Sequence, residues 1–371
     1  MNGATVDAIA QNYCYAVLMS HLVCIILCCS AINVEALENP SRMLTKPDTI
    51  TLRRSYCEQR LEELRVAIAG IDELAQASGL CIYVTGSYGR LEASEYSDLD
   101  LFFIHQGSQQ SSSFSKITKT LIDAELIKTC RKLNFPEFSG DGRYLQVHHL
   151  AEILEELGSP VDDYENYFTA RLLLLLESQP IYNETVYQEV MKKVIDAYFR
   201  DYHDHEADFR PIFLVNDITR FWKTLCLNYE HKRNRRPRKD EEKRNKNHLM
   251  NFKLKYSRLL TCFSATLYLS QNRKSVTPRT VLKLVSQPPL ERLEKIAANT
   301  PERINLLSQI YEEYAWFLDQ TGRPQEQVLA WIADRKTRDQ AFKRARNFGS
   351  LIFDLLRSVV NDPETFRYLV I

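Results

Sequence analysis

The sequence predicts an α/β (α+β) core with a small mixed sheet, followed by a region built only of helices. Two observations carry this prediction. Between residues 51 and 158, segments with helical periodicity alternate with short apolar segments of strand type. From about residue 159 onward, apolar residues recur at helical spacing in one segment after another. The composition agrees, because 371 residues with 44% hydrophobic and 26% charged residues are typical of a soluble globular protein large enough for two domains.

The elements of the core follow from periodicity and from the residues that interrupt it. Leu61, Leu64 and Ile68 lie three or four residues apart, as on one face of a helix, and Gly79 ends that pattern. The predicted elements are, in order, a helix over 51–78, strands over 81–85 and 99–104, a helix over 115–133, a strand over 143–150 and a helix that stops at Gly158.

Helix starts mark the region that follows. Ser159-Pro160, Thr277-Pro278 and Thr300-Pro301 each combine a hydroxyl residue with a proline, as is typical of the N-cap and first positions of a helix. We therefore expect a domain boundary near residue 160. The core would span residues 43–160, and an all-helical, substrate-binding domain would span residues 161–371.

Residues 1–42 form an apolar leader. Between Tyr13 and Val34 the sequence contains no Asp, Glu, Lys or Arg, which is long enough for a membrane-spanning helix. A basic segment typical of a signal peptide does not precede it, and positive charge begins only at Arg42. Three interpretations stay open: a start codon assigned too early, with Met43 as the first residue, a membrane anchor through residues 13–34, or a buried helix.

Charge and cysteine usage favour a cytoplasmic protein. Lys plus Arg equals Asp plus Glu at 48 each, and the cysteines after residue 42 are dispersed, without the spacing of a metal site. Residues 230–258 are the exception, with 12 Lys or Arg against 4 Asp or Glu. This basic segment is either a solvated loop or a surface that contacts RNA or other phosphate-rich ligands. Its most basic part lacks the interleaved aromatic residues that stack on bases.

The clearest chemistry lies between Cys81 and Ile104, in the stretch CIYVTGSYGRLEASEYSDLDLFFI. Residues i and i+2 of a strand share a face, so Asp98 and Asp100 are expected to project side by side. Two carboxylates held together repel each other unless a cation lies between them. Such an oxygen site suits Mg²⁺ together with substrate phosphates, with Mn²⁺ as the alternative metal.

The loop between the two strands offers groups that bind phosphate. Gly86 lets the backbone approach a phosphate closely, and the Ser87 hydroxyl and neighbouring N–H groups can donate to its oxygens. Arg90 adds a fork-shaped cation. A carboxylate pair and a phosphate loop next to each other predict a site for metal-assisted displacement at phosphorus.

This stretch resembles the nucleotidyltransferase superfamily of DNA polymerase β, which combines a hydrophobic strand, Gly-Ser or Gly-Gly, a loop and Asp-x-Asp or Asp-x-Glu. It is especially similar to the N-terminal nucleotidyltransferase domain of bacterial protein-PII uridylyltransferases. The matching residues are Gly86, Ser87, Tyr88, Gly89, Arg90, Glu92, Tyr96, Ser97, Asp98, Leu99 and Asp100. The resemblance implies a nucleotidyltransferase core that transfers a nucleoside monophosphate from an NTP to a protein or small-molecule acceptor, with Asp98 and Asp100 as Mg²⁺ ligands.

The resemblance implies further candidate residues. In the superfamily, a helix after the catalytic sheet often lends a Lys or Arg to the triphosphate. Lys253, Lys255 and Arg220 are the candidates here, with a solvated helix face as the alternative. Many members also carry a third carboxylate on the following strand. In this sequence that strand offers His148 or His149, as a base or as structural residues.

Three functions stay open at the level of the sequence. The preferred one is a Mg²⁺-dependent, uridylyltransferase-like transferase. The second is a nucleotide second-messenger or defence synthase, in which a second nucleotide is the acceptor. The third is a non-catalytic binding module with the same fold, and the lack of an acid on the predicted third strand keeps it open.

Overall fold

The structure is a computed structural model of the chain, and it describes residues 46–109, 115–136, 138, 145–234, 240–271, 275–298 and 300–360. Contacts group residues 44–371 into one compact unit. The apolar leader, with the alternative start at Met43 and the membrane anchor through residues 13–34, lies outside the described residues. Within the described ranges, no helix combines the length and apolar character needed to cross a membrane.

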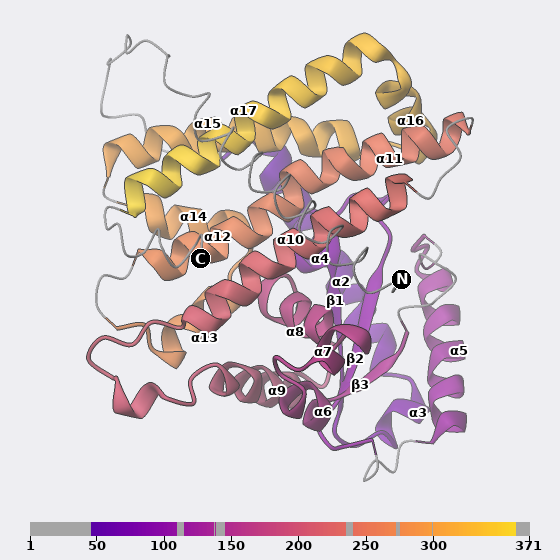
Figure 1. Cartoon of the computed structure of the whole chain (residues 1–371). Coiled ribbons are helices and arrows are strands. Elements are labelled where there is room, and N and C mark those ends of the chain that lie inside the picture. Colours follow the sequence, from indigo (N-terminus) through magenta and orange to yellow (C-terminus); the bar gives the residue numbers. More distant parts are fainter. Residues whose placement is uncertain are drawn as a thin grey trace, which may run out of the picture. The chain divides into compact units, whose positions relative to one another are not determined.

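A mixed sheet of four strands supports the site (Figure 1). The strands are β1 (Leu80–Thr85), β2 (Asp100–His105), β3 (Val147–His149) and β4 (Gln179–Tyr182), in the spatial order β3-β2-β1-β4. Strand β1 runs antiparallel to β2 and β4, whereas β2 and β3 are parallel. The first two strands confirm the prediction to within one residue. The third is shorter than predicted, because residues 145 and 146 are not in the strand and Leu150 begins the next helix, while residues 143 and 144 lie outside the described residues.

Three helices cover one face of the sheet: α2 (Asp48–Ile68), α3 (Asp72–Ala75) and α5 (Lys116–Lys132). Their apolar residues pack against Ile82, Val84 and Phe103 of the strands. The predicted helix over 51–78 is wrong in one respect, because it is interrupted between the end of α2 and the start of α3. Gly70 lies at this break, and glycine is among the weakest helix formers.

The other face carries Tyr83, Phe102 and Ile104, and it packs against the later helices. This second apolar cluster extends from the sheet through the last helix. The division into domains near residue 160 stays a prediction. The helices and turns on this side are α6 (Leu150–Glu155), α7 (Pro160–Tyr164), α8 (Tyr167–Leu176), α9 (Glu184–Ala197), η2 (Tyr202–Asp204), α10 (Ile212–Asn234), α11 (Glu241–Lys253), η3 (Leu254–Arg258), α12 (Leu259–Ser270), α13 (Pro278–Val285), α14 (Pro289–Ala297), α15 (Pro301–Thr321), α16 (Gln325–Ala333) and α17 (Arg335–Val359).

The region after residue 160 is mostly helical, as predicted, but not all-helical. Residues 179–182 form β4, which pairs with β1. The sequence Gln-Pro-Ile-Tyr hides this strand, since Pro180 has no N–H to donate to a neighbour. The proline is tolerated because β4 lies at the edge of the sheet.

Two of the three predicted helix starts have the expected side-chain caps. The Ser159 hydroxyl accepts a hydrogen bond from the Val161 N–H at the start of α7. Thr277 forms a capping box with Thr280 at the start of α13. Pro301 is the first residue of α15, as predicted, but the Thr300 side chain forms no cap hydrogen bond there.

Candidate functional site

The glycine loop and the acidic strand meet at the end of the sheet. Strand β1 ends at Thr85, which lies opposite Asp100 of β2, and the single turn α4 (Gly86–Gly89) follows directly. Gly86 has a φ of +67°, and a β-carbon on it would lie 2.8 Å from Oδ2 of Asp100. Position 86 therefore requires glycine for its backbone conformation and for the close approach of the carboxylate.

The two aspartates lie at the start of β2. Asp100 is its first residue and is half-buried, and Asp98 precedes the strand and is exposed. Leu99 and Leu101 are buried in the cluster formed with α2 and α5. The common face of the two carboxylates stays a prediction.

Lys253 approaches these aspartates from the helical region. It is the last residue of α11, and its ammonium group interacts electrostatically with both Asp98 and Asp100. Lys253 is exposed, yet the surrounding protein is dense enough for desolvation to lower its pKa, together with Arg90 and Arg258 and against the raising effect of the two aspartates. Charged groups from opposite halves of the sequence therefore interact electrostatically.

The other two predicted cations lie elsewhere. Lys255 interacts with Cys226 of α10. The Arg220 guanidinium pairs with Asp163 at 2.6 Å and lies 3.9 Å from the centre of the Phe168 ring. Of the three candidates, only Lys253 is brought to the aspartates by the contacts of the described residues.

A π-helical turn, η3, follows Lys253 directly. The Leu259 N–H donates to the Leu254 carbonyl, five residues back, and the Ser257 hydroxyl donates to the Lys253 carbonyl at 3.0 Å. In an α-helix, residues five apart are rotated by about 140° from each other. A π-turn brings such residues close to the same face. Lys253 and Arg258 can therefore both face the loop, an arrangement that no propensity in the sequence indicates.

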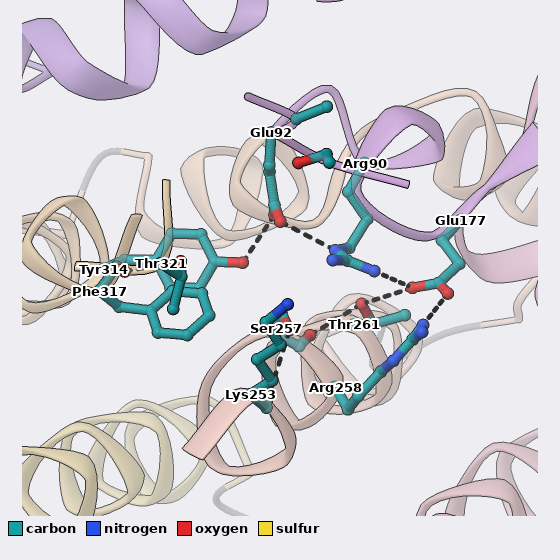
Figure 2. A network of polar contacts seen from close by, with 12 residues as sticks. Arg90, Glu92, Glu177, Lys253, Ser257, Arg258, Thr261, Tyr314, Phe317 and Thr321 are labelled. Carbon is teal, nitrogen blue, oxygen red and sulfur yellow. Dashed lines mark hydrogen bonds and ion pairs between the residues drawn. The ribbon is translucent and has the colours of Figure 1, made fainter. Parts of the chain in front are cut away.

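Arg90 lies in a buried polar network rather than on an open side of the loop (Figure 2). Its Nε donates to Oε2 of Glu92 at 2.9 Å, and its Nη1 donates to Oε2 of Glu177 at 2.7 Å. Glu177 also pairs with Arg258, and the Tyr314 hydroxyl donates to Oε1 of Glu92 at 2.7 Å. These contacts assign Arg90 to holding the loop in place, and its predicted contact with phosphate stays a prediction.

Burial and ion pairing oppose each other within this network. Burial by itself would raise the pKa of the Glu177 carboxyl, but Arg258 and Arg90 outweigh it, so the pKa lies below its ordinary value. For Glu92, burial outweighs its contacts with Arg90 and Tyr314, and its pKa is raised. Glu177 is therefore the carboxylate that is most firmly held in its charged form.

His148 has the environment of a structural histidine. Its ring stacks on Phe102 with centroids 6.3 Å apart and meets Tyr167 edge-on at 6.1 Å. Burial lowers the pKa of His148 to about 4, with a smaller contribution from His149, so the ring is neutral at pH 7. In the register of β2 and β3 it lies opposite Ile104, four residues beyond Asp100.

His149 lies on the other face of β3, with its ring centroid 5.6 Å from that of His105. Strand β3, Val147–His149, contains no carboxylate. A third acid next to Asp98 and Asp100 is therefore not supplied by this strand. The role of either histidine as a base stays a prediction.

The donor set can accommodate a divalent cation only with help from a substrate. Within the described ranges, no cluster of three or more His, Cys, Asp and Glu side chains is arranged to hold a metal ion. Asp98 and Asp100 form a pair of oxygen donors. One or two carboxylates completed by phosphate oxygens and water are the usual environment of Mg²⁺, so these residues fit the predicted metal.

The basic segment is paired with neighbouring acids where the structure describes it. Arg233 contacts Glu230, and the first turns of α11 hold further pairs between basic and acidic residues three or four positions apart. Residues 235–239 lie outside the described residues. These contacts are typical of a solvated helix end, and contact with RNA stays a prediction.

No protein-family model and no curated protein sequence matches the chain.

Proposed function

We propose that the chain is a Mg²⁺-dependent nucleotidyltransferase that moves a nucleoside monophosphate from an NTP to an acceptor hydroxyl. The observation that carries the proposal is the electrostatic interaction of Lys253 with Asp98 and Asp100, of which Asp100 lies against the glycine turn. A cation for the triphosphate, two carboxylates for a metal and a backbone that admits phosphate are the groups this reaction requires.

Each group has a distinct role in this proposal. Asp98 and Asp100 would hold Mg²⁺, which when bound neutralises part of the phosphate charge. Lys253 would bind the oxygens of the triphosphate as a point charge. The Gly86-Ser87 turn would place N–H groups and a hydroxyl against the same phosphates. Orientation of the NTP against its acceptor then supplies much of the catalysis, as is usual in phosphoryl-type transfers.

The transfer itself breaks one bond at phosphorus and forms another. The acceptor oxygen bonds to the α-phosphorus, and the bond from this phosphorus to the bridging oxygen of the β-phosphate breaks. Pyrophosphate leaves with the bonding electrons, and the proton of the acceptor hydroxyl is released to solvent. The acceptor is a protein or a small molecule, and a uridylyltransferase-like choice of nucleotide belongs to the proposal.

One observation favours a second candidate, a binding module without catalysis. Strand β3 carries the buried, neutral His148 and no carboxylate, whereas many nucleotidyltransferases of the superfamily that the sequence resembles have an acid on this strand. Such a module would bind an NTP with Mg²⁺ but transfer nothing. Binding and transfer therefore have to be measured separately.

The test uses each of the four NTPs, labelled either on the α- or on the γ-phosphate, with Mg²⁺ and with or without cell lysate. We expect the α-label to reach an acceptor and the γ-label to leave in pyrophosphate. Asp98→Asn with Asp100→Asn should reduce transfer by at least about a hundredfold, the scale for losing groups that stabilise charge in the transition state. Asp204→Asn with Asp208→Asn is the matched control, because both of these acids are exposed and lie in the segment between α9 and α10.

The outcomes separate the candidates. Label in a small nucleotide product without lysate identifies the second-messenger synthase. Binding of labelled NTP without any transfer identifies the non-catalytic module. Transfer that survives the double substitution, in protein with an unchanged melting temperature, contradicts the assignment of the site.

A further inference from the structure

The carboxylate of Glu177 contacts both sides of the candidate site. Glu177 follows α8 directly, and its side chain is fully buried. One oxygen accepts from Arg90 of the glycine loop at 2.7 Å, and the other pairs with Arg258 of η3. Thr261 of α12 adds a third contact at 3.2 Å. Figure 2 shows both arginines joined to this carboxylate, each at a different oxygen.

The backbone of Glu177 is also in direct contact with the loop. A β-carbon on Gly89 would overlap the carbonyl oxygen of Glu177 and would lie 3.1 Å from the Val84 carbonyl oxygen. Two residues after Glu177, Gln179 pairs with Val84 at the end of β1. The loop is therefore tied to residue 177 by a side-chain ion pair, by a close backbone approach and by the adjoining strand pair.

On the helical side, Glu177 acts on the segment that carries Lys253. Because the π-turn places Lys253 and Arg258 near one face, anchoring Arg258 also fixes the rotation of the turn at Lys253. Arg90 and Arg258 both form ion pairs with Glu177, and Arg90 forms a second one with Glu92. Lys253 forms no ion pair within the described residues. Glu177 thus pairs with the two arginines, while Lys253 interacts electrostatically with Asp98 and Asp100.

We infer that Glu177 is a positioning residue, which holds the glycine loop and Lys253 in register through Arg90 and Arg258. It contacts the groups that would bind the nucleotide, and is buried away from the nucleotide itself. The use of this register for an NTP rests on the proposed function. The register itself is a property of the folded chain and can be measured without nucleotide.

The first measurement needs no NTP. The full chain is treated with a low dose of an acetylating reagent, and mass spectrometry compares the labelling rates of Lys253 and Lys255. Glu177→Gln and Arg258→Gln should each change the ratio of these rates by more than about threefold, because Lys253 loses its fixed environment while Lys255 does not. Lys46→Gln and Glu294→Gln are the matched controls, since this 2.7 Å pair joins the segment before α2 to α14. If the Glu177 and Arg258 variants leave the ratio as the controls do, the inference is overturned.

The second measurement is the affinity for UTP and for ATP with Mg²⁺. Glu177→Gln and Arg258→Gln should each weaken binding about tenfold, the scale of one charge-assisted contact. In the Lys253→Ala background, Arg258→Gln should add less than about twofold, because it acts through the lysine, whereas Glu177→Gln should keep the part of its loss that arises in the glycine loop. A loss from Arg258→Gln that multiplies in full in that background contradicts action through Lys253. If Glu177→Gln fails to fold, Arg258→Gln decides, since that side chain is 30% exposed.

The two measurements fail independently. A wild-type chain that binds neither UTP nor ATP, while Glu177→Gln still shifts the labelling of Lys253, removes the proposed function and supports the positioning role. If the wild-type chain binds nucleotide but labelling of Lys253 is unchanged in both variants, the proposed function is supported and the positioning role is removed.

Discussion

The backbone of Gly86 lies directly against the carboxylate of Asp100, so a β-carbon at position 86 would be 2.8 Å from Oδ2 of the aspartate. The register of β1 and β2, in which Thr85 is opposite Asp100, creates this contact. The phosphate loop and the metal-binding pair are therefore one local structure, in which a change on one side displaces the other.

Gly86→Ala should reduce stability and NTP-dependent transfer together. A non-glycine residue at a φ of +67° costs about 1–2 kcal/mol, and the added methyl group would also push Asp100 away. Urea unfolding measures the first effect and the α-label assay measures the second. Gly349→Ala is the control with the opposite sign, because nothing lies within 4 Å of its β-carbon in α17 and alanine stabilises a helix interior by about 0.5–1 kcal/mol. Wild-type transfer by Gly86→Ala would refute the role of this contact.

Arg90→Ala should destabilise the fold far more than the loss of a surface arginine. The substitution leaves the buried Glu92 without its cation, and Glu177 keeps only its pair with Arg258. Breaking a buried pair in this way costs about 3–5 kcal/mol. Arg233→Ala is the control, because its pair with Glu230 is exposed and such pairs are worth about 0–1 kcal/mol. Both values come from urea unfolding with the slope checked for two-state behaviour. Equal losses for the two variants would show that the network contributes little.

His148 should make the protein sensitive to acid. Burial lowers its pKa from the ordinary 6.5 to about 4, so between these pH values the unfolded chain binds more protons than the folded one. Above about pH 6.5 His148 does not change the free energy of unfolding. As the pH falls from there towards 4, this free energy decreases by up to about 3 kcal/mol.

His148→Phe keeps a ring against Phe102 and removes the titrating group. We expect its free energy of unfolding to fall by about 2 kcal/mol less than that of the wild type between pH 7 and pH 4.5. His203→Gln, at a site where the side chain is 88% exposed, should follow the wild type. Parallel curves for His148→Phe and the wild type would mean that His148 is not held neutral by the fold.

Local patterns predict the core of the site but not what holds it in place. The strands around the glycine loop are continuous apolar runs, and Asp100 begins the second of them, opposite Thr85 at the end of the first. Glu177 follows a run of five leucines in the sequence, and nothing local indicates that its carboxylate is buried between arginines 87 residues before it and 81 residues after it. Such pairing depends on the packing of distant elements, which periodicity does not encode.

The different surroundings of Lys253 and Lys255 also depend on the packing of distant elements. Lys253 and Lys255 are equivalent in the sequence, both basic and both near the start of an apolar helical segment. A helix rotates by about 100° per residue, so two residues apart they face different neighbours. Lys253 meets the aspartates, whereas Lys255 meets Cys226 of α10.

Lys253→Ala should therefore weaken the binding of UTP and ATP with Mg²⁺ about tenfold, while Lys255→Ala changes it by less than about twofold. The two substitutions remove the same side chain from the same helical segment, so losses through helix propensity or net charge are shared. Lys253→Arg keeps the charge and should recover part of the affinity, because the role assigned here is that of a cation close to phosphate. The melting temperatures of all three variants, measured without nucleotide, separate binding from folding. Equal affinities for Lys253→Ala and Lys255→Ala would remove Lys253 from the site, and with it the observation on which the proposed function depends.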